Sequence, residues 1–158
     1  MSAGVLDSIR DLLDREGVDY RLLHHEPTRT SEESARVRGE SVRIGGKALL
    51  MKVGDGFRLF VLSAALKLDS GAIRAHFGIR KMRFATPVEL EDMTGLVPGS
   101  VPPFGTPILP YPLYVDESII ANERIAFNAG SLTDSIIMSV ADYQTIAKPE
   151  VFRFAQPT

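Results

Sequence analysis

Six prolines and two glycines fall within the seventeen residues from 96 to 112, and this composition limits the folds open to the chain. Proline has no backbone N–H and a fixed φ, so the segment cannot form a helix interior or a central strand. A loop of this length in a compact domain is usually functional, because binding and catalytic groups are often carried on loops. The sequence therefore predicts a long, stiff, functional loop between two regions of regular structure.

Regular elements are predicted on both sides of this loop. Helical spacing of apolar residues and capping signals, such as a capping box formed by Thr30 and Glu33, predict helices, whereas short apolar runs between turns predict strands. The predicted helices are residues 5–16, 30–37, 69–77, 86–94 and 142–148. The predicted strands are residues 18–25, 47–53, 57–63, 80–85, 113–115, 124–128, 135–140 and 151–155. Hairpins with interspersed helices favour one α+β domain over residues 1–158, with a mixed, mainly antiparallel sheet.

Composition narrows the class of protein. Of 158 residues, 44% are hydrophobic and 24% are charged, which is typical of a globular domain. The chain has no cysteine, which excludes disulfides, thiolate metal sites and a cysteine nucleophile. The formal net charge of −2 gives no overall field to attract a polyanion. Without a signal-peptide pattern or an apolar run long enough for a membrane span, we expect a soluble, cytoplasmic, monomeric protein.

The histidines do not form a recognisable metal or nucleophile motif. His24 and His25 are adjacent in a predicted strand, so their side chains should point to opposite faces, and we expect them to be exposed or half-buried. The sequence lacks HExxH, paired histidines at helical spacing, a Gly-x-Ser-x-Gly elbow and the nucleotide-binding glycine motifs. Spacing alone leaves a Ser-His-Asp triad open, because triads assemble in space. Because the metal-binding and nucleotide-binding motifs are missing, we expect no metal and no cofactor.

Three short motifs carry the remaining candidate chemistry. Gly45 and Gly46 place Lys47 at the start of an apolar strand, where it faces solvent or a pocket mouth, and the glycines would let a ligand approach closely. Residues 99–105 can hold backbone N–H groups in a fixed direction, which suits a carbonyl oxygen or an oxyanion, although a rigid connector is the alternative. Residues 128–131 end a strand and form either part of the site or an ordinary turn.

In this order and spacing, the motifs resemble the YbaK/prolyl-tRNA synthetase-associated family of editing domains. The resemblance covers nearly the whole chain. Its motifs are residues 25–33 (HEPTRTSEE), 46–49 (GKAL), Thr94-Gly95, the Gly-x-x-x-Pro loop 99–103 with Phe104-Gly105 behind it, and 128–130 (NAG). The resemblance implies the family's fold, with a barrel-like sheet and surrounding helices. It also implies a freestanding deacylase that hydrolyses the ester of a mischarged tRNA, with a small amino acid on a tRNA for proline as a candidate substrate.

The resemblance further implies roles for individual residues. Lys47 would help to hold the tRNA end, and Gly99 and Pro103 would belong to the catalytic loop that contacts the aminoacyl group. The implied substrate-binding residues are Thr30, Gly46, Ser100, Val101, Pro102, Phe104, Gly105, Asn128, Gly130 and Ser135. A neighbouring hydroxyl of the substrate would help to activate the attacking water, which agrees with the lack of a convincing general base in the sequence. The implied partner is the 3′ end of a mischarged aminoacyl-tRNA, with an aminoacyl-tRNA synthetase as a second candidate.

Two departures from the family pattern leave the substrate open. Pro102 stands where many relatives have serine or cysteine, and residues 131–133 replace a basic residue and an Arg-Gly pair. Two other functions therefore stay open: a noncatalytic module that binds a tRNA end, and a hydrolase of small acyl esters. Basic residues near the motifs could supply phosphate contacts to a tRNA. These are Arg36, Arg38, Arg43, Lys47 and Lys52, with a second group of Arg74, Arg80, Lys81 and Arg83.

Overall fold

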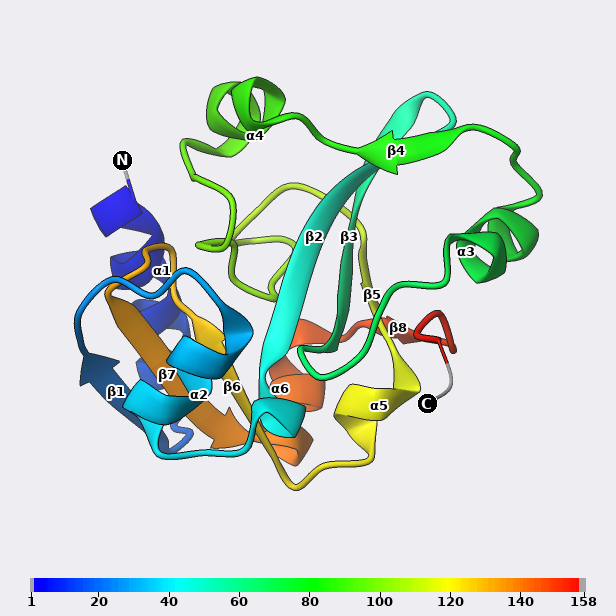
Figure 1. The fold of residues 1–158 in the computed structure, drawn as a ribbon. Coiled ribbons are helices and arrows are strands. Elements are labelled where there is room, and N and C mark those ends of the chain that lie inside the picture. Colours follow the sequence, from blue (N-terminus) through cyan, green and yellow to red (C-terminus); the bar gives the residue numbers. More distant parts are fainter. Residues whose placement is uncertain (1, 157–158) are drawn as a thin grey trace.

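The computed structural model describes residues 2–156 and contains two sheets that lie side by side (Figure 1). The helices are α1 (Ser2–Arg15), α2 (Ser31–Arg38), the 3-10 turn η1 (Val42–Ile44), α3 (Ser70–Phe77), α4 (Pro87–Thr94), α5 (Glu117–Ile120) and α6 (Val140–Ala147). The strands are β1 (Tyr20–His24), β2 (Gly46–Val53), β3 (Gly56–Ser63), β4 (Met82–Phe84), β5 (Leu113–Val115), β6 (Arg124–Asn128), β7 (Asp134–Ser139) and β8 (Glu150–Val151). None of the helices described here combines the length and apolar character that a membrane crossing requires.

One sheet is antiparallel throughout and has the strand order β1-β7-β6. The other has the order β4-β2-β3-β5-β8, in which β4, β2 and β3 pair antiparallel, while β5 and β8 add in parallel. The two sheets meet where Gly45, just before β2, forms an isolated parallel bridge with Ala126 of β6. The prediction of a mixed, mainly antiparallel α+β fold is confirmed. The expected barrel-like sheet needs correction, because the two sheets do not close into a barrel within residues 2–156.

The central strands of the five-stranded sheet, β2, β3 and β5, are covered on both faces by two hydrophobic clusters. Along β3, Leu59 and Val61 belong to the larger cluster, which also contains Ile9 of α1, whereas Phe60 and Leu62 belong to the smaller one. This alternation follows from the two-residue period of a strand. Each fully buried side chain of this kind stabilises the fold by about 1.5–3 kcal/mol. The sheet therefore provides a rigid base for groups carried at the ends of its strands.

Side-chain caps fix the starts of α2 and α4. The Thr30 hydroxyl accepts a hydrogen bond from the Glu33 N–H at 3.1 Å and begins α2. The Glu33 carboxylate accepts from the N–H of Arg29 rather than from that of Thr30, so the predicted capping box is displaced by one residue. A complete capping box, formed by Thr86 and Glu89, begins α4. Caps of this type are typically worth about 1 kcal/mol, and they define where the chain enters each helix.

The last predicted strand, residues 151–155, is largely absent from the structure. The N–H groups of Phe154 and Ala155 both donate to Asp116 Oδ1, at 2.6 and 2.8 Å, so these residues leave the sheet after β8. Asp116 also begins α5, because its other carboxylate oxygen accepts from the Ser118 N–H at 2.8 Å. The sequence pattern did not indicate α5. One buried carboxylate thus explains both differences.

Candidate functional site

A cleft opens where α2, the start of β2 and the proline-rich loop meet. It encloses a cavity of about 270 Å³. The predicted site residues that line it are Thr30, Gly46, Lys47, Gly99, Val101 and Asn128. The other polar lining residues are Thr28, Arg29, Ser31, Ser34 and Arg38. The fold therefore brings residues from all three sequence motifs to one cavity.

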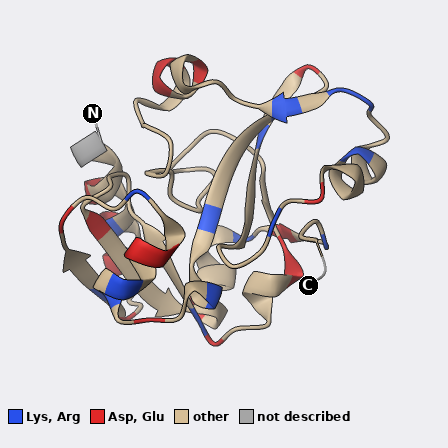
Figure 2. Cartoon of the chain, viewed as in Figure 1, with Lys and Arg blue, Asp and Glu red and all other residues tan. Residues whose placement is uncertain are grey.

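The cleft is positively charged. Its charged lining residues are Arg29, Arg38 and Lys47, and no Asp, Glu, His or Cys of the described chain lines it. Figure 2 shows basic residues on β2 and β4, and acidic residues on α4 and α2; the acidic residues of α2, Glu32 and Glu33, do not line the cleft. A hollow with cations and without carboxylates favours an anionic ligand. It also presents no carboxylate or imidazole that could act as a general base.

Packing within the protein restricts the two glycines before Lys47, most strongly Gly46. A Cβ on Gly46 would lie 2.8 Å from Cδ1 of Ile125, in the neighbouring sheet. A Cβ on Gly45 would lie 3.1 Å from the Cβ of Ala64. The close approach of β6 therefore accounts for Gly46, and Ala64, directly after β3, restricts Gly45. Lys47 is the second residue of β2, and this strand holds it at the cleft.

The turn at residues 97–101 leaves two backbone donors free. The Ser100 N–H donates to the Val97 carbonyl at 3.1 Å, and the Ser100 hydroxyl donates to the same carbonyl at 2.7 Å. Ser100 is 1% exposed and does not line the cleft. The N–H groups of Gly99 and Val101 have no hydrogen-bond acceptor among the residues described, and both residues line the cleft. These two amides are candidate donors to a carbonyl oxygen or an oxyanion.

The rest of the loop anchors the turn in the core. Phe104 is 1% exposed and packs against Phe127 and Tyr143, with ring centroids 5.5 Å apart in each pair. The Tyr143 hydroxyl donates to the Pro103 carbonyl at 2.6 Å, and burial raises the pKa of this hydroxyl. The predicted site residues that are buried here, off the wall of the cleft, are Pro102, Pro103, Phe104 and Gly105. They lie between the turn and the core, where Phe104 and the Pro103 carbonyl contact Tyr143.

Next to the cleft, a network of polar side chains connects α2 with β6 and β7. Arg38 donates from Nη2 to Asn128 Oδ1 and from Nε to Ser135 Oγ, each at 3.0 Å. Asn128 Nδ2 in turn donates to the Gly99 carbonyl at 2.7 Å. His25 Nε2 lies 2.8 Å from Ser135 Oγ. Ser135 is fully buried and does not line the cleft, so it supports the site from behind.

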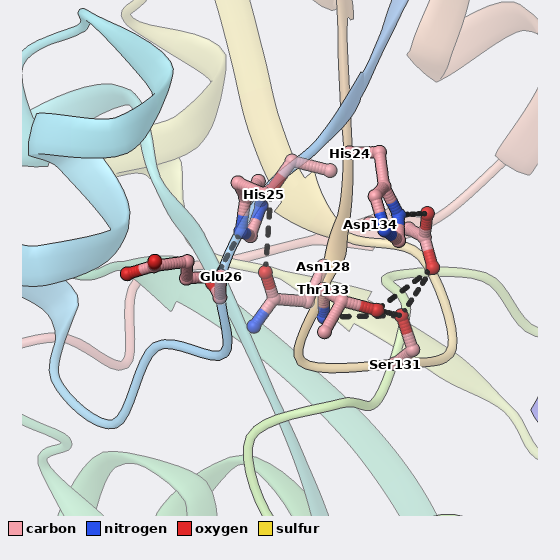
Figure 3. Close-up of polar contacts among 8 residues, drawn as sticks. His24, His25, Glu26, Asn128, Ser131, Thr133 and Asp134 are labelled. Atoms are coloured by element: carbon pink, nitrogen blue, oxygen red, sulfur yellow. Dashed lines mark hydrogen bonds and ion pairs between the residues drawn. The ribbon is translucent and has the colours of Figure 1, made fainter.

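The two adjacent histidines have separate partners, as the strand period predicts (Figure 3). His24 is exposed and its Nδ1 lies 2.9 Å from Asp134 Oδ1, whereas half-buried His25 turns to the other side of the chain. Sequence pattern alone indicates no role for His25, and it indicates Arg38 only as a candidate phosphate contact. A signal for Arg38 is nevertheless present, because Ser34 and Arg38 are four residues apart on the buried face of α2.

Arg38 is a buried cation without a carboxylate partner. It is 9% exposed, and burial lowers its pKa to about 10, so the guanidinium stays charged at neutral pH. None of the ion pairs formed by the described residues includes it. Neutral oxygens hold the guanidinium instead. Burying a charge without an opposite charge is costly, and this cost points to a functional reason for the residue.

A second cavity, of about 300 Å³, adjoins the cleft. Leu132 and Arg29 line both cavities, and a Cβ on Gly99 would lie 3.4 Å from Cδ2 of Leu132. Gly130 and Ser100, both predicted to bind substrate, line this second cavity. The Gly130 N–H donates to the Ser100 carbonyl at 3.0 Å, which ties the two segments together. The predicted residues are therefore divided between two neighbouring hollows and the core beneath them.

Comparison with known proteins identifies the class to which this fold and cleft belong. Residues 25–146 match the family described as the aminoacyl-tRNA editing domain, and the chain belongs to this family. It is 36% identical over 151 residues to the Escherichia coli K12 protein named multifunctional Ser/Thr-tRNA deacylase ProXp-y, covering 90% of this chain and 88% of that protein. It is 25% identical over 141 residues to the prolyl-tRNA editing protein ProX of Acetoanaerobium sticklandii, covering 86% of each.

A solved structure agrees with this assignment. The crystal structure of a proposed trans-editing enzyme for prolyl tRNA synthetase superposes with a TM-score of 0.82. The superposition covers 97% of this chain and 98% of that one, at 25% identity. The family resemblance predicted from the sequence motifs is thus confirmed.

Proposed function

We propose that this chain is a trans-editing deacylase, which hydrolyses the ester bond between a wrong amino acid and the 3′ end of its tRNA. The observation that carries the proposal is the cleft, in which Lys47 and two free loop amides surround one cavity without an acid. Membership of the editing-domain family supports it. An ester is cleaved more readily than an amide, so positioning and backbone donors can supply much of the catalysis without a nucleophilic side chain.

The cations of the cleft are proposed to bind the terminal nucleotide. Lys47 and Arg29 would contact its phosphate oxygens, and one charge-assisted hydrogen bond contributes about 1.5–3 kcal/mol. Because each neutralised phosphate releases a counterion, the affinity for tRNA should fall as salt is added. A local positive cleft on a chain with a net charge of −2 suits recognition of one end of the nucleic acid rather than coating of its length.

The loop amides are proposed to act on the reacting carbonyl. A water oxygen attacks the ester carbon, and the carbonyl oxygen becomes an oxyanion that accepts from the N–H groups of Gly99 and Val101. The bond from the carbon to the ribose oxygen then breaks, and the proton from the water passes to that ribose oxygen. Since the cleft offers no carboxylate or imidazole, we assign activation of the water to the neighbouring ribose hydroxyl, as the family resemblance implies. One preorganised donor typically accelerates such a step by about 100- to 1000-fold.

The amino acid that is removed is proposed to be small, with serine and threonine first. The E. coli relative is named for these two amino acids, and its similarity extends over 90% of this chain. Thr28, Ser31 and Ser34 line the cleft. Because the hydroxyls of Thr28 and Ser34 hydrogen-bond to each other at 2.8 Å, a hydroxyl on the substrate would join this pair or bind Ser31. A tRNA for proline is a candidate carrier, because the name of a second relative refers to prolyl-tRNA.

Incubation with tRNAs mischarged with serine, threonine, alanine or proline, scored as release of free amino acid, tests the proposal. We expect release from at least one mischarged tRNA, at a rate that falls with added salt. A hydrolase of small acyl esters would cleave an aminoacyl ester without tRNA equally well, with no such salt dependence. A noncatalytic module would bind the tRNA end without release. Either outcome would contradict the proposed function.

A further inference from the structure

We infer that Arg38, Ser135 and His25 form a positioning relay, which sets the amide orientation of Asn128 and thereby fixes the Gly99 peptide at the wall of the cleft. The residues come from four separate segments: α2, β7, the residue after β1, and β6. The inference rests on the proposed function, because the fixed peptide would matter for the loop amides that bind the ester carbonyl. None of the three relay residues needs to touch the substrate for this role.

The charge on Arg38 selects the orientation of the Asn128 amide. Asn128 Oδ1 accepts from Arg38 Nη2 at 3.0 Å, and Nδ2 donates to the Gly99 carbonyl at 2.7 Å. In the flipped orientation, the NH₂ group would face the guanidinium donors, and the amide oxygen would face the Gly99 carbonyl oxygen. Both contacts would be repulsive, because donors would meet donors and acceptors would meet acceptors. Arg38 therefore holds Asn128 in the orientation that donates to the loop.

His25 completes the relay by orienting the hydroxyl of Ser135. His25 Nδ1 lies 2.8 Å from the Glu26 carbonyl oxygen, which can only accept, so Nδ1 carries the proton. In the neutral ring Nε2 is then an acceptor, and the Ser135 hydroxyl donates to it at 2.8 Å. This leaves the lone pairs of Ser135 Oγ for Arg38 Nε. The competing contact from Ser135 Oγ to Asn128 Oδ1 is longer, at 3.4 Å.

The peptide between Gly99 and Ser100 is held at both ends. Its carbonyl accepts from Asn128 Nδ2 at 2.7 Å, and its N–H donates to the Val97 carbonyl at 3.1 Å. Because a peptide is planar, fixing this unit restricts the directions of the N–H groups on either side, which belong to Gly99 and Val101. These are the two free amides that line the cleft. The relay thus fixes the directions of the proposed oxyanion donors without contacting the substrate.

The geometry of the relay requires an arginine at this position. Nε and Nη2 are neighbouring donors in one plane, and they reach acceptors on two different strands. Lysine carries a single ammonium group and cannot hold both acceptors in that plane. A competing role for Arg38 is direct contact with a phosphate of the substrate, since Arg38 also lines the cleft. The two roles predict different kinetics.

The isosteric change Asn128→Asp tests the relay first. The new carboxylate still pairs with Arg38, but it loses the donor to the Gly99 carbonyl and repels that oxygen. We expect kcat on a mischarged tRNA to fall at least about 30-fold with Tm not lowered. KM should also rise, because the new carboxylate lines a cleft proposed to bind an anion. Asn122→Asp is the matched control, because Asn122 Nδ2 also donates to backbone carbonyls, those of Arg43 and Ser118. An unchanged kcat in Asn128→Asp would overturn the inference.

The change Arg38→Gln separates positioning from direct contact with the substrate. If Arg38 acts through Asn128, the losses from Arg38→Gln and Asn128→Asp are not additive, and the double variant should be within about threefold of the slower single variant. Arg38→Lys should not restore kcat. Arg15→Gln, at an exposed position on α1, is the control. Additive losses together with a raised KM and a weaker salt dependence would show a phosphate contact and would contradict the relay.

Amide hydrogen exchange gives a readout that does not depend on turnover. In Arg38→Gln and Asn128→Asp we expect faster exchange at residues 97–101, with exchange in β2 and β3 unchanged. Unchanged exchange at residues 97–101 in both folded variants would overturn the inference. If the wild-type chain releases no amino acid from any mischarged tRNA, the proposed function fails, whereas the exchange result still decides whether the relay fixes the loop.

Discussion

Removing the charge of Lys47 tests most directly whether the cations of the cleft bind the tRNA end. We expect Lys47→Ala to lower kcat/KM for a mischarged tRNA at least about tenfold, because one charge-assisted contact is worth about 1.5–3 kcal/mol. The fold should be retained, since Lys47 lines the cleft and is not part of the core. Lys67→Ala, at an exposed lysine that does not line the cleft, is the control. An unchanged kcat/KM in a folded Lys47→Ala protein would contradict the role given to this lysine.

Substitution of Gly99 should lower the rate far more than substitution of Ser100. Gly99 has a φ of 88°, so Gly99→Val strains the backbone and moves the amides; we expect kcat/KM to fall at least about 100-fold. The Ser100 hydroxyl is bonded within the turn to Val97, so Ser100→Ala should lower Tm and reduce the rate much less. Both variants are compared on one mischarged tRNA, with mass spectrometry for an acyl adduct. Loss of all turnover in Ser100→Ala, with an acyl group trapped on Ser100 of the wild type, would show a serine nucleophile.

Only part of the site could be predicted at the level of residues. Lys47, Gly99 and Asn128 belong to short motifs, and they line the same cleft. The relay could not be predicted, because Arg38 and His25 meet Ser135 across separations of 97 and 110 residues. No local spacing encodes such contacts.

At the scale of elements, the capping box of α4 predicts a pH dependence of stability. The Arg83 guanidinium, together with the Thr86 N–H, lowers the pKa of Glu89 to about 2 from its ordinary value of 4.5. A carboxylate whose pKa is lower in the folded state stabilises the fold above its unfolded pKa, and this stabilisation is lost as pH falls through the folded pKa. The Tm difference between wild type and Glu89→Gln should therefore be present at pH 7 and shrink between pH 4.5 and about 2. Thermal melts across this range provide the check, and a constant difference would contradict it.

Elements with local signals were predictable, and elements set by distant contacts were not. The hairpin of β2 and β3 and the start of α4 follow from a glycine turn and a capping box, both of which are read from adjacent residues. By contrast, β7 ends before the predicted residue 140, because the Ser139 hydroxyl accepts from the Asp142 N–H and begins α6. The loss of the strand predicted over residues 151–155 depends on Asp116, which lies far away in the sequence.

At the scale of the whole molecule, one buried hydrogen bond joins the functional loop to α6. Tyr143→Phe keeps the ring that packs against Phe104 but removes the donor to the Pro103 carbonyl. The carbonyl is then left buried without its partner, so we expect the free energy of unfolding to fall by about 1–3 kcal/mol. Urea denaturation measures this change. An unchanged free energy of unfolding would show that the bond does not anchor the loop.

The class of the fold could be predicted, but its division into two sheets could not. Hairpins with interspersed helices indicated a mixed, mainly antiparallel α+β domain, which the structure contains. The separate three-stranded sheet depends on the pairing of β1 with β7, two strands more than a hundred residues apart. Contacts at that separation are set by packing of the whole chain and leave no mark in a local pattern.

Single-turnover hydrolysis of a tRNA mischarged with serine or threonine, with the protein in excess and EDTA present, tests whether the cleft cleaves an aminoacyl ester. We expect the amino acid to be released at least about 100-fold faster than in buffer alone, and at the same rate without EDTA. The second expectation rests on the lack of cysteine and of paired histidines; within residues 2–156, no group of three His, Cys, Asp or Glu could hold a metal ion. Release no faster than in buffer, or release abolished by EDTA and restored by zinc, would contradict the proposed mechanism.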